Sequence, residues 1–295
     1  MSGEKKDELL LVGGQAVIEG VLMRGKDKAV VAVRTDSGKI VSREWRLRPV
    51  QDRFWLLKLP FVRGVIVLFE TLVLGFRALS FSANAAGGRD SDGRGAVGRK
   101  ELFFSFAFSI AFAVLLFVVG PLFLASVLVS RGGILFNVVD GIFRLLALLL
   151  YLVVISFFRD VQRIFQYHGA EHMAIHAYER GDQLSFVKIR KYPTMHPRCG
   201  TSFLLLVVLV SVLAFSVVNP AGLVLKLLSR IVLFPVIAGC SYELLRLGAK
   251  FEKNPFMGVL VFPGLLLQRI TTKEPDEGQV EVAVAALRDV IKRRS

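Results

Sequence analysis

The chain has little of two residue types that often carry function: it contains two cysteines and four histidines among its 295 residues. The cysteines, Cys199 and Cys240, stand far apart and give no sign of a disulfide framework. The first ten residues, MSGEKKDELL, lack the apolar core and the cleavage site of a secretory signal peptide. We therefore expect the N-terminal region to remain in the cytosol.

Acidic residues are also scarce, since 24 Asp and Glu stand against 38 Lys and Arg and give a formal net charge of +14. Such an excess of positive charge is typical of proteins that bind nucleic acid or contact a membrane surface. The sequence lacks a strong nucleic-acid-binding motif and a basic patch interleaved with aromatic residues, so no nucleic acid is expected as a partner. We assign the charge to membrane topology and to contact with anionic lipid headgroups of the bilayer.

Charge is nearly absent from four long stretches of the sequence. They run from Leu102 to Val129, from Gly141 to Phe158, from Thr201 to Val218 and from Leu223 to Leu245. A helix of about 20 apolar residues crosses a hydrocarbon core of roughly 30 Å. The sequence therefore predicts about four transmembrane helices and a mostly α-helical membrane protein. Kinks are expected at Gly120-Pro121 and Pro235.

The basic residues alternate between the connections of these stretches. They gather in the N-terminal region, between Arg89 and Lys100, between Arg159 and Arg198, and after Arg246. The two remaining connections are short and nearly uncharged. Because cytosolic loops carry the excess of lysine and arginine, both termini are expected in the cytosol.

The segment 1–60 is expected to form a small cytosolic β-structure of three or four strands. Alternating or apolar strand-like runs span Ala29 to Val33 and Ile40 to Trp45. Between them, Thr35-Asp-Ser-Gly38 has the composition of a hairpin turn. The glycines of GGQAVIEG show no obvious hairpin spacing, but they suggest a close approach of the backbone.

The remaining segments have less regular patterns. Residues 61–83 are apolar apart from Arg63, Glu70 and Arg77, which predicts an amphipathic or re-entrant helix, although a full crossing is not excluded. Residues 84–101 read as a flexible linker. The membrane domain is expected over 102–247, with a cytosolic loop at 159–200, and an interfacial segment and cytosolic tail over 248–295.

Three of the four histidines lie between Tyr167 and Glu179, in the stretch YHGAEHMAIHAYE. The three-four spacing predicts a helix that continues the second transmembrane helix or is jointed to it, and Gly181 suits its C-terminal cap. One face of this helix carries, in order, Val161, Ile164, Phe165, His168, His172 and Ile175.

His168-Gly-Ala-Glu171-His172 matches the pattern H-x-x-E-H, the inverse of the zincin motif. Residues four apart share a helix face, so the two imidazoles can bind one ion. In such sites the glutamate takes a proton from a water molecule whose pKa zinc lowers to about 7. Glu171 is accordingly the candidate general base. His176 continues the face, and Glu179 is a candidate acceptor for an imidazole N–H.

The same cytosolic loop contains His196-Pro-Arg-Cys199. A pair on a turn together with a pair on a helix is a familiar arrangement around zinc, and mixed imidazole and thiolate donors favour zinc over other divalent metals. The candidate ligands are therefore His168, His172, His196 and Cys199. If all four bind, the shell is closed and structural, whereas three ligands leave a position open for chemistry.

Two further carboxylates are candidates for the second shell or for alternate ligation. Glu19 stands in the glycine-rich stretch, and Glu243 lies near the cytosolic end of the fourth apolar stretch. A carboxylate at such a depth has a partner, for which Arg246 or Arg230 is the simple alternative to the site. Asp140 and Arg144, four residues apart, are expected to pair.

Three stretches together resemble the YqhQ-like family of bacterial membrane proteins: GGQAVIEGVLMRG, QYHGAEHMAIHAYERG and KYPTMHPRCGTSFL. The resemblance covers most of the chain, from about Gly13 to about Glu243. The family is usually described as metal-dependent enzymes of unknown function. The resemblance implies a multi-pass protein of the bacterial inner membrane. It points to Glu19, His168, Glu171, His172, Glu179, His196 and Cys199, and less clearly to His176.

Three hypotheses of function follow. The first is a zinc-dependent hydrolase at the cytosolic face, with Glu171 as general base. The second is a non-enzymatic membrane scaffold, whose structural zinc ties the histidine helix to the 193–200 loop while its basic face docks a partner or lipid. The third, a transporter or channel, needs polar groups deep in the spans, which the first and third stretches lack.

Overall fold

The computed structural model describes residues 12–48, 54–87, 99–129, 133–250 and 255–292. It opens with a four-stranded antiparallel sheet in the order β1-β2-β3-β4. The strands are β1 (Gly13–Val17), β2 (Gly20–Arg24), β3 (Lys28–Arg34) and β4 (Ile40–Arg46). Gly38, with a φ of 79°, closes the turn between β3 and β4 at the predicted place. The expected small N-terminal β-structure is therefore confirmed.

The first hairpin of the sheet is the part that the sequence pattern did not predict. Val17 pairs with Gly20, so Ile18 and Glu19 form a two-residue turn. Glu19 adopts a φ of 50°, a conformation that glycine or asparagine usually supplies. Because the turn residues are Ile and Glu, the stretch lacks the composition of a hairpin turn.

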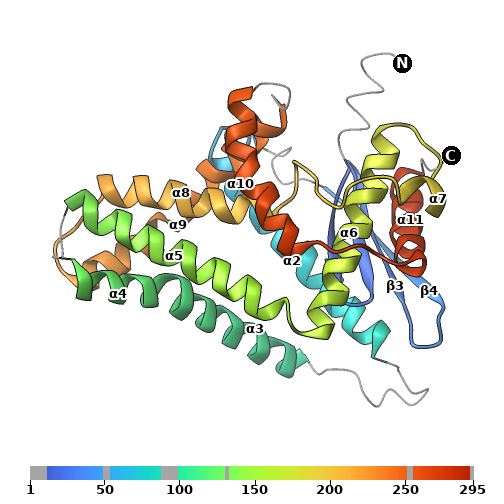
Figure 1. The fold of residues 1–295 in the computed structure, drawn as a ribbon, viewed down its shortest axis with the longest axis horizontal. Helices are drawn as coiled ribbons and strands as arrows, with labels where there is room; N and C mark the ends of the chain where they lie inside the picture. The colour runs from blue at the N-terminus through green and yellow to red at the C-terminus, as the bar shows by residue number, and fades with distance from the viewer. Residues whose placement is uncertain (1–11, 49–53, 88–98, 130–132, 251–254, 293–295) are drawn as a thin grey trace.

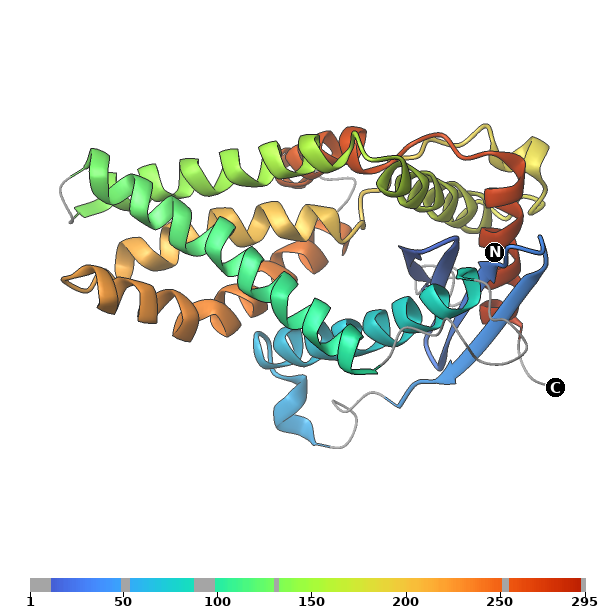
Figure 2. The ribbon, with the colours of Figure 1, turned by 90° about the horizontal axis from the view of Figure 1, so that it is seen from below.

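Both faces of the sheet are covered. On one face Val21, Met23, Val30 and Ala32 pack against α6 (Arg159–Glu179) and α11 (Glu277–Ile291). On the other face Leu22, Val31 and their neighbours pack against α2 (Val62–Ala86). Figure 2 shows the sheet between α2 and the pair formed by α6 and α11. Burial on both faces explains why β2 and β3 are almost wholly apolar.

Helix α2 covers the segment 61–83, for which the sequence left a full crossing open. It is long and apolar enough to cross a membrane. Its C-terminal half, however, buries Leu74 and Ala78 against the sheet. In its N-terminal half, Gly64 lies against Gly239 of α9 (Leu223–Lys250) so closely that an added Cβ would stand 3.0 Å from the Gly239 carbonyl oxygen. A short 3₁₀ helix, η2 (Trp55–Lys58), precedes it.

Four helices of the described residues are long and apolar enough to span a membrane. Three of them coincide with predicted spans: Phe103–Leu128, Gly133–Ile155 and Leu223–Gly248. The fourth is α2. The predicted span 201–218 forms α8 (Thr201–Val217), an apolar helix of 17 residues, which is about 26 Å long. The chain is thus a mostly helical multi-pass membrane protein.

The first of the spans predicted from the sequence is built from three segments, α3 (Arg99–Val114), the π-helix η3 (Leu115–Val119) and α4 (Gly120–Leu128). The π turn immediately precedes Pro121, which lacks an N–H for the α-helical hydrogen bond. At the predicted kink the helix therefore changes from α-helical to π-helical hydrogen bonding. Pro235 likewise lies inside α9.

The span α5 (Gly133–Ile155) lies beside α4 and α8, and the end of α4, the start of α5 and the α8–α9 turn lie at one end of the bundle (Figure 1). The other end, which we call the sheet end, carries the sheet, α6, α11 and the short α7 (Phe186–Ile189). The described part of the chain begins just before β1 and ends just after α11, both at the sheet end.

Charged side chains are buried inside the bundle. The predicted pair is confirmed, since Arg144 Nη2 lies 3.0 Å from Asp140 Oδ2. The same oxygen accepts a hydrogen bond of 2.7 Å from Arg230. Lys226 is also buried, with its ammonium 4.4 Å from the centre of the Phe136 ring. This group, Asp140, Arg144, Lys226 and Arg230, is called the buried charge cluster below.

The last two helices, α10 (Pro255–Thr271) and α11, pack against elements that come earlier in the chain. Helix α10, part of the segment expected at the membrane interface, packs back against α8. The connection that follows lies along α6, where the Lys273 N–H donates to the Phe165 carbonyl. Asp276 and Gln279 form a capping box that starts α11. Residues predicted as a separate cytosolic tail thus complete the core of the sheet.

The predicted linker 84–101 lies mostly outside the described residues. Its described ends belong to helices, since α2 continues to Ala86 and α3 begins at Arg99. The first predicted segment, 1–60, is described from Val12 onward, with residues 49–53 left out.

Candidate metal centre

Helix α6 carries the histidine stretch and starts after a break in the chain. Helix α5 ends at Ile155, and extended backbone at Phe158 (ψ 131°) precedes α6. The two helices are therefore jointed, as one of the two sequence interpretations held. At the other end Gly181, with a φ of 73°, follows the C-cap, and the Asp182 N–H bonds the Ala177 carbonyl.

The loop before α8 carries the second half of the site. Its position is set by the side chain of Gln268 on α10, which is fully buried. The Gln268 amide accepts from the His196 N–H at 2.7 Å and donates to the His196 carbonyl at 2.9 Å. This pair of bonds ties the loop to the end of the bundle.

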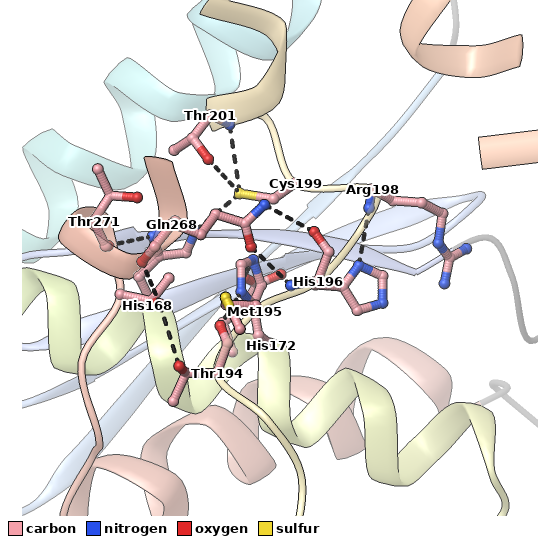
Figure 3. A network of polar contacts seen from close by, with 12 residues as sticks. His168, His172, Thr194, Met195, His196, Arg198, Cys199, Thr201, Gln268 and Thr271 are labelled. Atoms are coloured by element: carbon pink, nitrogen blue, oxygen red, sulfur yellow. Dashed lines mark hydrogen bonds and ion pairs between the residues drawn. The ribbon is translucent and has the colours of Figure 1, made fainter. Parts of the chain in front are cut away.

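Three donors meet between α6 and this loop. The ligand atoms of His168, His172 and Cys199 all lie within 4.8 Å of one another. His168 Nε2 is 3.2 Å from Cys199 Sγ, and the centres of the two imidazole rings are 4.4 Å apart. Figure 3 shows His168 and Cys199 joined in this contact. We call these three residues the first cluster.

Backbone carbonyls orient both imidazoles of the first cluster. His168 Nδ1 lies 2.8 Å from the Thr271 carbonyl oxygen, and His172 Nδ1 lies 2.5 Å from that of Thr194. A carbonyl only accepts, so each Nδ1 carries the hydrogen and each Nε2 presents a lone pair. Burial lowers the pKa of His172 well below 6.5, which keeps the ring neutral. Neutral imidazoles held in this way are ready to bind a metal ion.

Cys199 is a buried thiol with a second partner. The Thr201 hydroxyl lies 3.2 Å from its sulfur, and the Thr201 N–H donates to the sulfur at 3.4 Å. Burial raises the pKa of the thiol to about 12. A cation at the first cluster would reverse this preference, because metal coordination deprotonates a thiol.

Glu171 lies beside the first cluster, with its Oε2 3.4 Å from His172 Nε2. That oxygen is buried and has no hydrogen-bond partner among the described residues. Burial raises the pKa of Glu171 to about 7, against a hydrogen bond from the Gly14 backbone. Gly14 must lack a side chain here, because a Cβ would lie 2.7 Å from Glu171 Oε1.

His196 departs from the expected set of four ligands. Its Nδ1 accepts a hydrogen bond of 3.2 Å from the Arg198 N–H, and its Nε2 lies 3.6 Å from Glu179 Oε2. Figure 3 shows the His196 ring turned away from Cys199, toward Arg198. The structure therefore brings together three of the four predicted ligands. It groups His196 with His176 and Glu179 instead.

Glu19 does not join either group, which corrects the expectation that placed it near the site. Its carboxylate receives two hydrogen bonds of 2.5 Å from Arg163, and Tyr167 donates to it at 3.2 Å. Its role is to fasten the β1–β2 turn to α6. The glycine-rich stretch thus contributes to the site through Gly14 and not through Glu19.

Glutamine at position 19 should reduce stability in a pH-dependent way. The Arg163 bonds lower the pKa of Glu19 below its usual 4.5. A lowered folded-state pKa gives stability that is complete above the unfolded pKa and is lost as pH falls through the folded one. Arg163 is half exposed, so Glu19→Gln should cost about 1 kcal/mol or less at pH 7.

The measurement is thermal unfolding of wild type and Glu19→Gln in detergent, from pH 7 to pH 3. The gap between the two should narrow as pH falls below 4.5 and close once pH has passed the lowered folded-state pKa of Glu19, where both side chains are uncharged. A gap that persists unchanged at pH 3 would contradict the ion-pair account.

Glu243 also lies outside the site. It forms an ion pair with an arginine that the sequence did not suggest. Its carboxylate takes two bonds from Arg63 of α2, one of 2.8 Å from Nε. Arg230, one of the two expected partners, binds Asp140 instead. Arg63 and Glu243 are 180 residues apart, so no local spacing in the sequence predicts the pair.

Sequence reasoning missed three contributors to the site. Gln268 and the Thr271 carbonyl come from α10, which the sequence marked only as a short apolar segment. The Thr194 carbonyl comes from the loop itself. Gln268 is polar within PFMGVLVFPGLLLQRI, and this interruption of an apolar run is the one signal that could have drawn attention to it.

Comparison with known proteins identifies one matching family model and a similar bacterial protein. The family model described as "Protein of unknown function (DUF1385)" matches residues 59–293. The "Uncharacterized protein YqhQ" of Bacillus subtilis (strain 168) is 32% identical over 294 residues, which cover 95% of this chain and 92% of that protein. No solved structure matches the chain.

Proposed function

The chain belongs to the DUF1385 family of proteins of unknown function, and we propose that it is a zinc-dependent hydrolase of the bacterial inner membrane. The proposal places the site at the cytosolic face. The observation that carries it is the first cluster with Glu171 beside it: three donor atoms within 4.8 Å of one another, and a buried carboxylate oxygen that no described residue hydrogen-bonds.

The donor set fits zinc. Two neutral imidazoles and one thiolate are ligands of the kind that catalytic zinc sites use. His196 lies with Glu179 rather than with Cys199, so the protein supplies three donors instead of the closed set of four. Three donors leave a coordination position for a substrate or a water molecule.

Glu171 supplies the proton acceptor in this proposal. A zinc ion at the first cluster would make water nucleophilic near neutral pH and polarise a carbonyl or phosphoryl oxygen. Glu171 Oε2 would take the proton from the attacking water, because this buried oxygen has no hydrogen bond within the described ranges of the chain. Its Oε1 stays fixed against Gly14. The Thr194 and Thr271 carbonyls hold the imidazoles in place during the reaction.

The cytosolic location rests on charge. The sheet end carries the basic segment Arg159 to Arg198, whereas the sequence that joins α4 to α5, like the sequence that joins α8 to α9, is short. The positive-inside rule then assigns the sheet end and both termini to the cytosol. Anionic headgroups of the inner leaflet are the expected partners of the basic surface.

A membrane scaffold with a structural zinc is the second candidate. The observation that favours it is the position of the first cluster, where α6, the loop before α8 and the end of α10 meet. A metal ion there would hold the sheet end to the bundle. In this case the ion would stabilise the protein without any turnover.

Glu171→Gln separates the two candidates. We expect the purified protein to bind about one zinc at the first cluster, and the variant to keep that ion while turnover falls by about 10²-fold or more. Zinc content and hydrolysis are measured together, on a panel of peptide amides, phospholipids and phosphate esters. Glu274→Gln, which removes an exposed carboxylate three residues after Thr271, is the matched control.

Two outcomes count against the hydrolase. Turnover that is unchanged in Glu171→Gln would remove the general base from the proposal. Zinc that raises the unfolding temperature, without hydrolysis of any substrate on the panel, would favour the scaffold.

A further inference from the structure

A second group of donors lies one turn beyond the first cluster. His176, Glu179 and His196 offer ligand atoms that all lie within 4.8 Å of one another, and they share no residue with the first cluster. The ring centres of His176 and His196 are 4.5 Å apart, and His196 Nε2 is 3.6 Å from Glu179 Oε2. We call these three residues the second cluster.

We infer that the second cluster is a separate divalent-cation site, and that Arg198 competes with the cation for it. Two imidazoles and one carboxylate form a donor set found in metalloenzymes. Imidazole and carboxylate without thiolate suit zinc, manganese, iron(II) and cobalt(II). The inference does not rest on the hydrolase proposal, because a cation can occupy this site whether or not the first cluster performs chemistry.

The geometry of His176 supports a ligand role. Its Nε2 lies 2.9 Å from the Met195 carbonyl oxygen, so this nitrogen carries the hydrogen and Nδ1 keeps a lone pair. A carbonyl acceptor for one ring nitrogen is the arrangement that orients metal-binding histidines. Glu179 lies three residues further along α6 and therefore shares the helix face with His176.

Arg198 occupies the place of a cation in the structure. Its guanidinium is ion-paired with Glu179. Its backbone N–H donates to His196 Nδ1 at 3.2 Å, so the hydrogen of a neutral His196 ring sits on Nε2, toward Glu179. A cation bound to the second cluster requires the guanidinium to leave and this hydrogen to move to Nδ1. Both costs involve Arg198, which makes the second site weaker than the first.

The two clusters are close enough to influence each other. The ring centres of His172 and His196, one from each cluster, are 5.6 Å apart. A cation in the first cluster therefore repels a second one electrostatically. We expect sequential filling, with the first cluster occupied at lower concentration.

Cobalt titration of the metal-free protein in detergent tests the inference, because cobalt reports thiolate ligation by a charge-transfer band. Only the first cluster contains a cysteine. We expect this band to saturate at one equivalent, while the d–d absorption continues to rise to two. His176→Ala and, separately, Glu179→Gln should leave the charge-transfer band intact and reduce the total to one. Cys199→Ser should abolish the band and keep the second equivalent.

Arg198→Gln provides the sharper test of competition. Removing the guanidinium should tighten the second equivalent by roughly tenfold, the effect expected for a charged hydrogen bond of about 1.5 kcal/mol. Arg190→Gln, an exposed arginine of the same loop, is the matched control and should change nothing.

Two results would overturn the inference. One is a total of one equivalent in both wild type and Arg198→Gln at saturating cobalt. The other is a charge-transfer band that weakens in His176→Ala, since the two clusters would then share one ion. Failure of the first site is distinguishable, because the band would be missing while the second equivalent remains.

Discussion

Asparagine in place of Asp140 is expected to destabilise the protein by about 3–5 kcal/mol, the largest effect that we predict, because it leaves buried cations without their counter-charge. Among the described residues of α5 and α9, the buried charged side chains are one carboxylate and three cations. One oxygen of Asp140 serves both Arg144 and Arg230. The readout is the fraction of monodisperse protein in detergent, together with its apparent unfolding temperature.

Arg144→Met is the matched control for that experiment. It removes one cation and keeps the apolar stem length, while Arg230 still pairs with Asp140 at 2.7 Å. Because Asp140 keeps Arg230 as its counter-charge, the substitution leaves no buried carboxylate uncompensated, and we expect a change of less than about 1 kcal/mol. Equal losses in the two variants would show that packing, and not charge balance, dominates at the buried charge cluster.

The second large effect is expected at Gly169, in the middle of the histidine stretch. A Cβ there would lie 2.1 Å from the Lys273 carbonyl oxygen, which is backbone and cannot swing aside. Gly169→Ala should therefore push the α10–α11 connection away from α6, at a cost on the order of 2–4 kcal/mol. The Thr271 carbonyl moves with that connection, so the orientation of His168 should be lost as well.

Gly200→Ala is the control for this substitution, since an added Cβ at Gly200 meets no atom within 4 Å. We expect it to unfold within a few degrees of wild type and to bind cobalt at the first cluster normally. Gly169→Ala should show both a lower unfolding temperature and a weaker charge-transfer band. A Gly169→Ala protein with wild-type stability would contradict the close approach of the connection to α6.

The features that sequence predicted well are those set by local pattern. The spacing of His168, His172 and Ile175 predicted α6, and Gly181 predicted its end, because periodicity and caps depend on neighbours along the chain. Apolar length likewise predicted three spans, and Asp140 and Arg144 are one helical turn apart. Each of these depends on residues within a few positions of one another.

The parts that sequence could not supply depend on contacts between distant segments. Whether His196 joins Cys199 or Glu179 is decided by the bonds from Gln268 and the Arg198 N–H, which fix the loop and the ring. Composition alone would allow either set. Glu19 and Glu243 pair with arginines that are 144 and 180 residues away in the sequence. Only the folded structure could therefore show that these two carboxylates lie outside the site.

The covering of the sheet has a consequence for how the chain is made. The four strands leave the ribosome first, but α11, which closes one of their faces, ends at Ile291 and leaves last. Contacts so far apart in sequence form slowly. Val21, Met23 and Val30 can therefore be covered only in part, by α6, until every membrane helix has been synthesised. The core of the sheet is therefore completed only after the membrane helices have been made, and a chain that stops before α11 exposes a strand surface prone to aggregation.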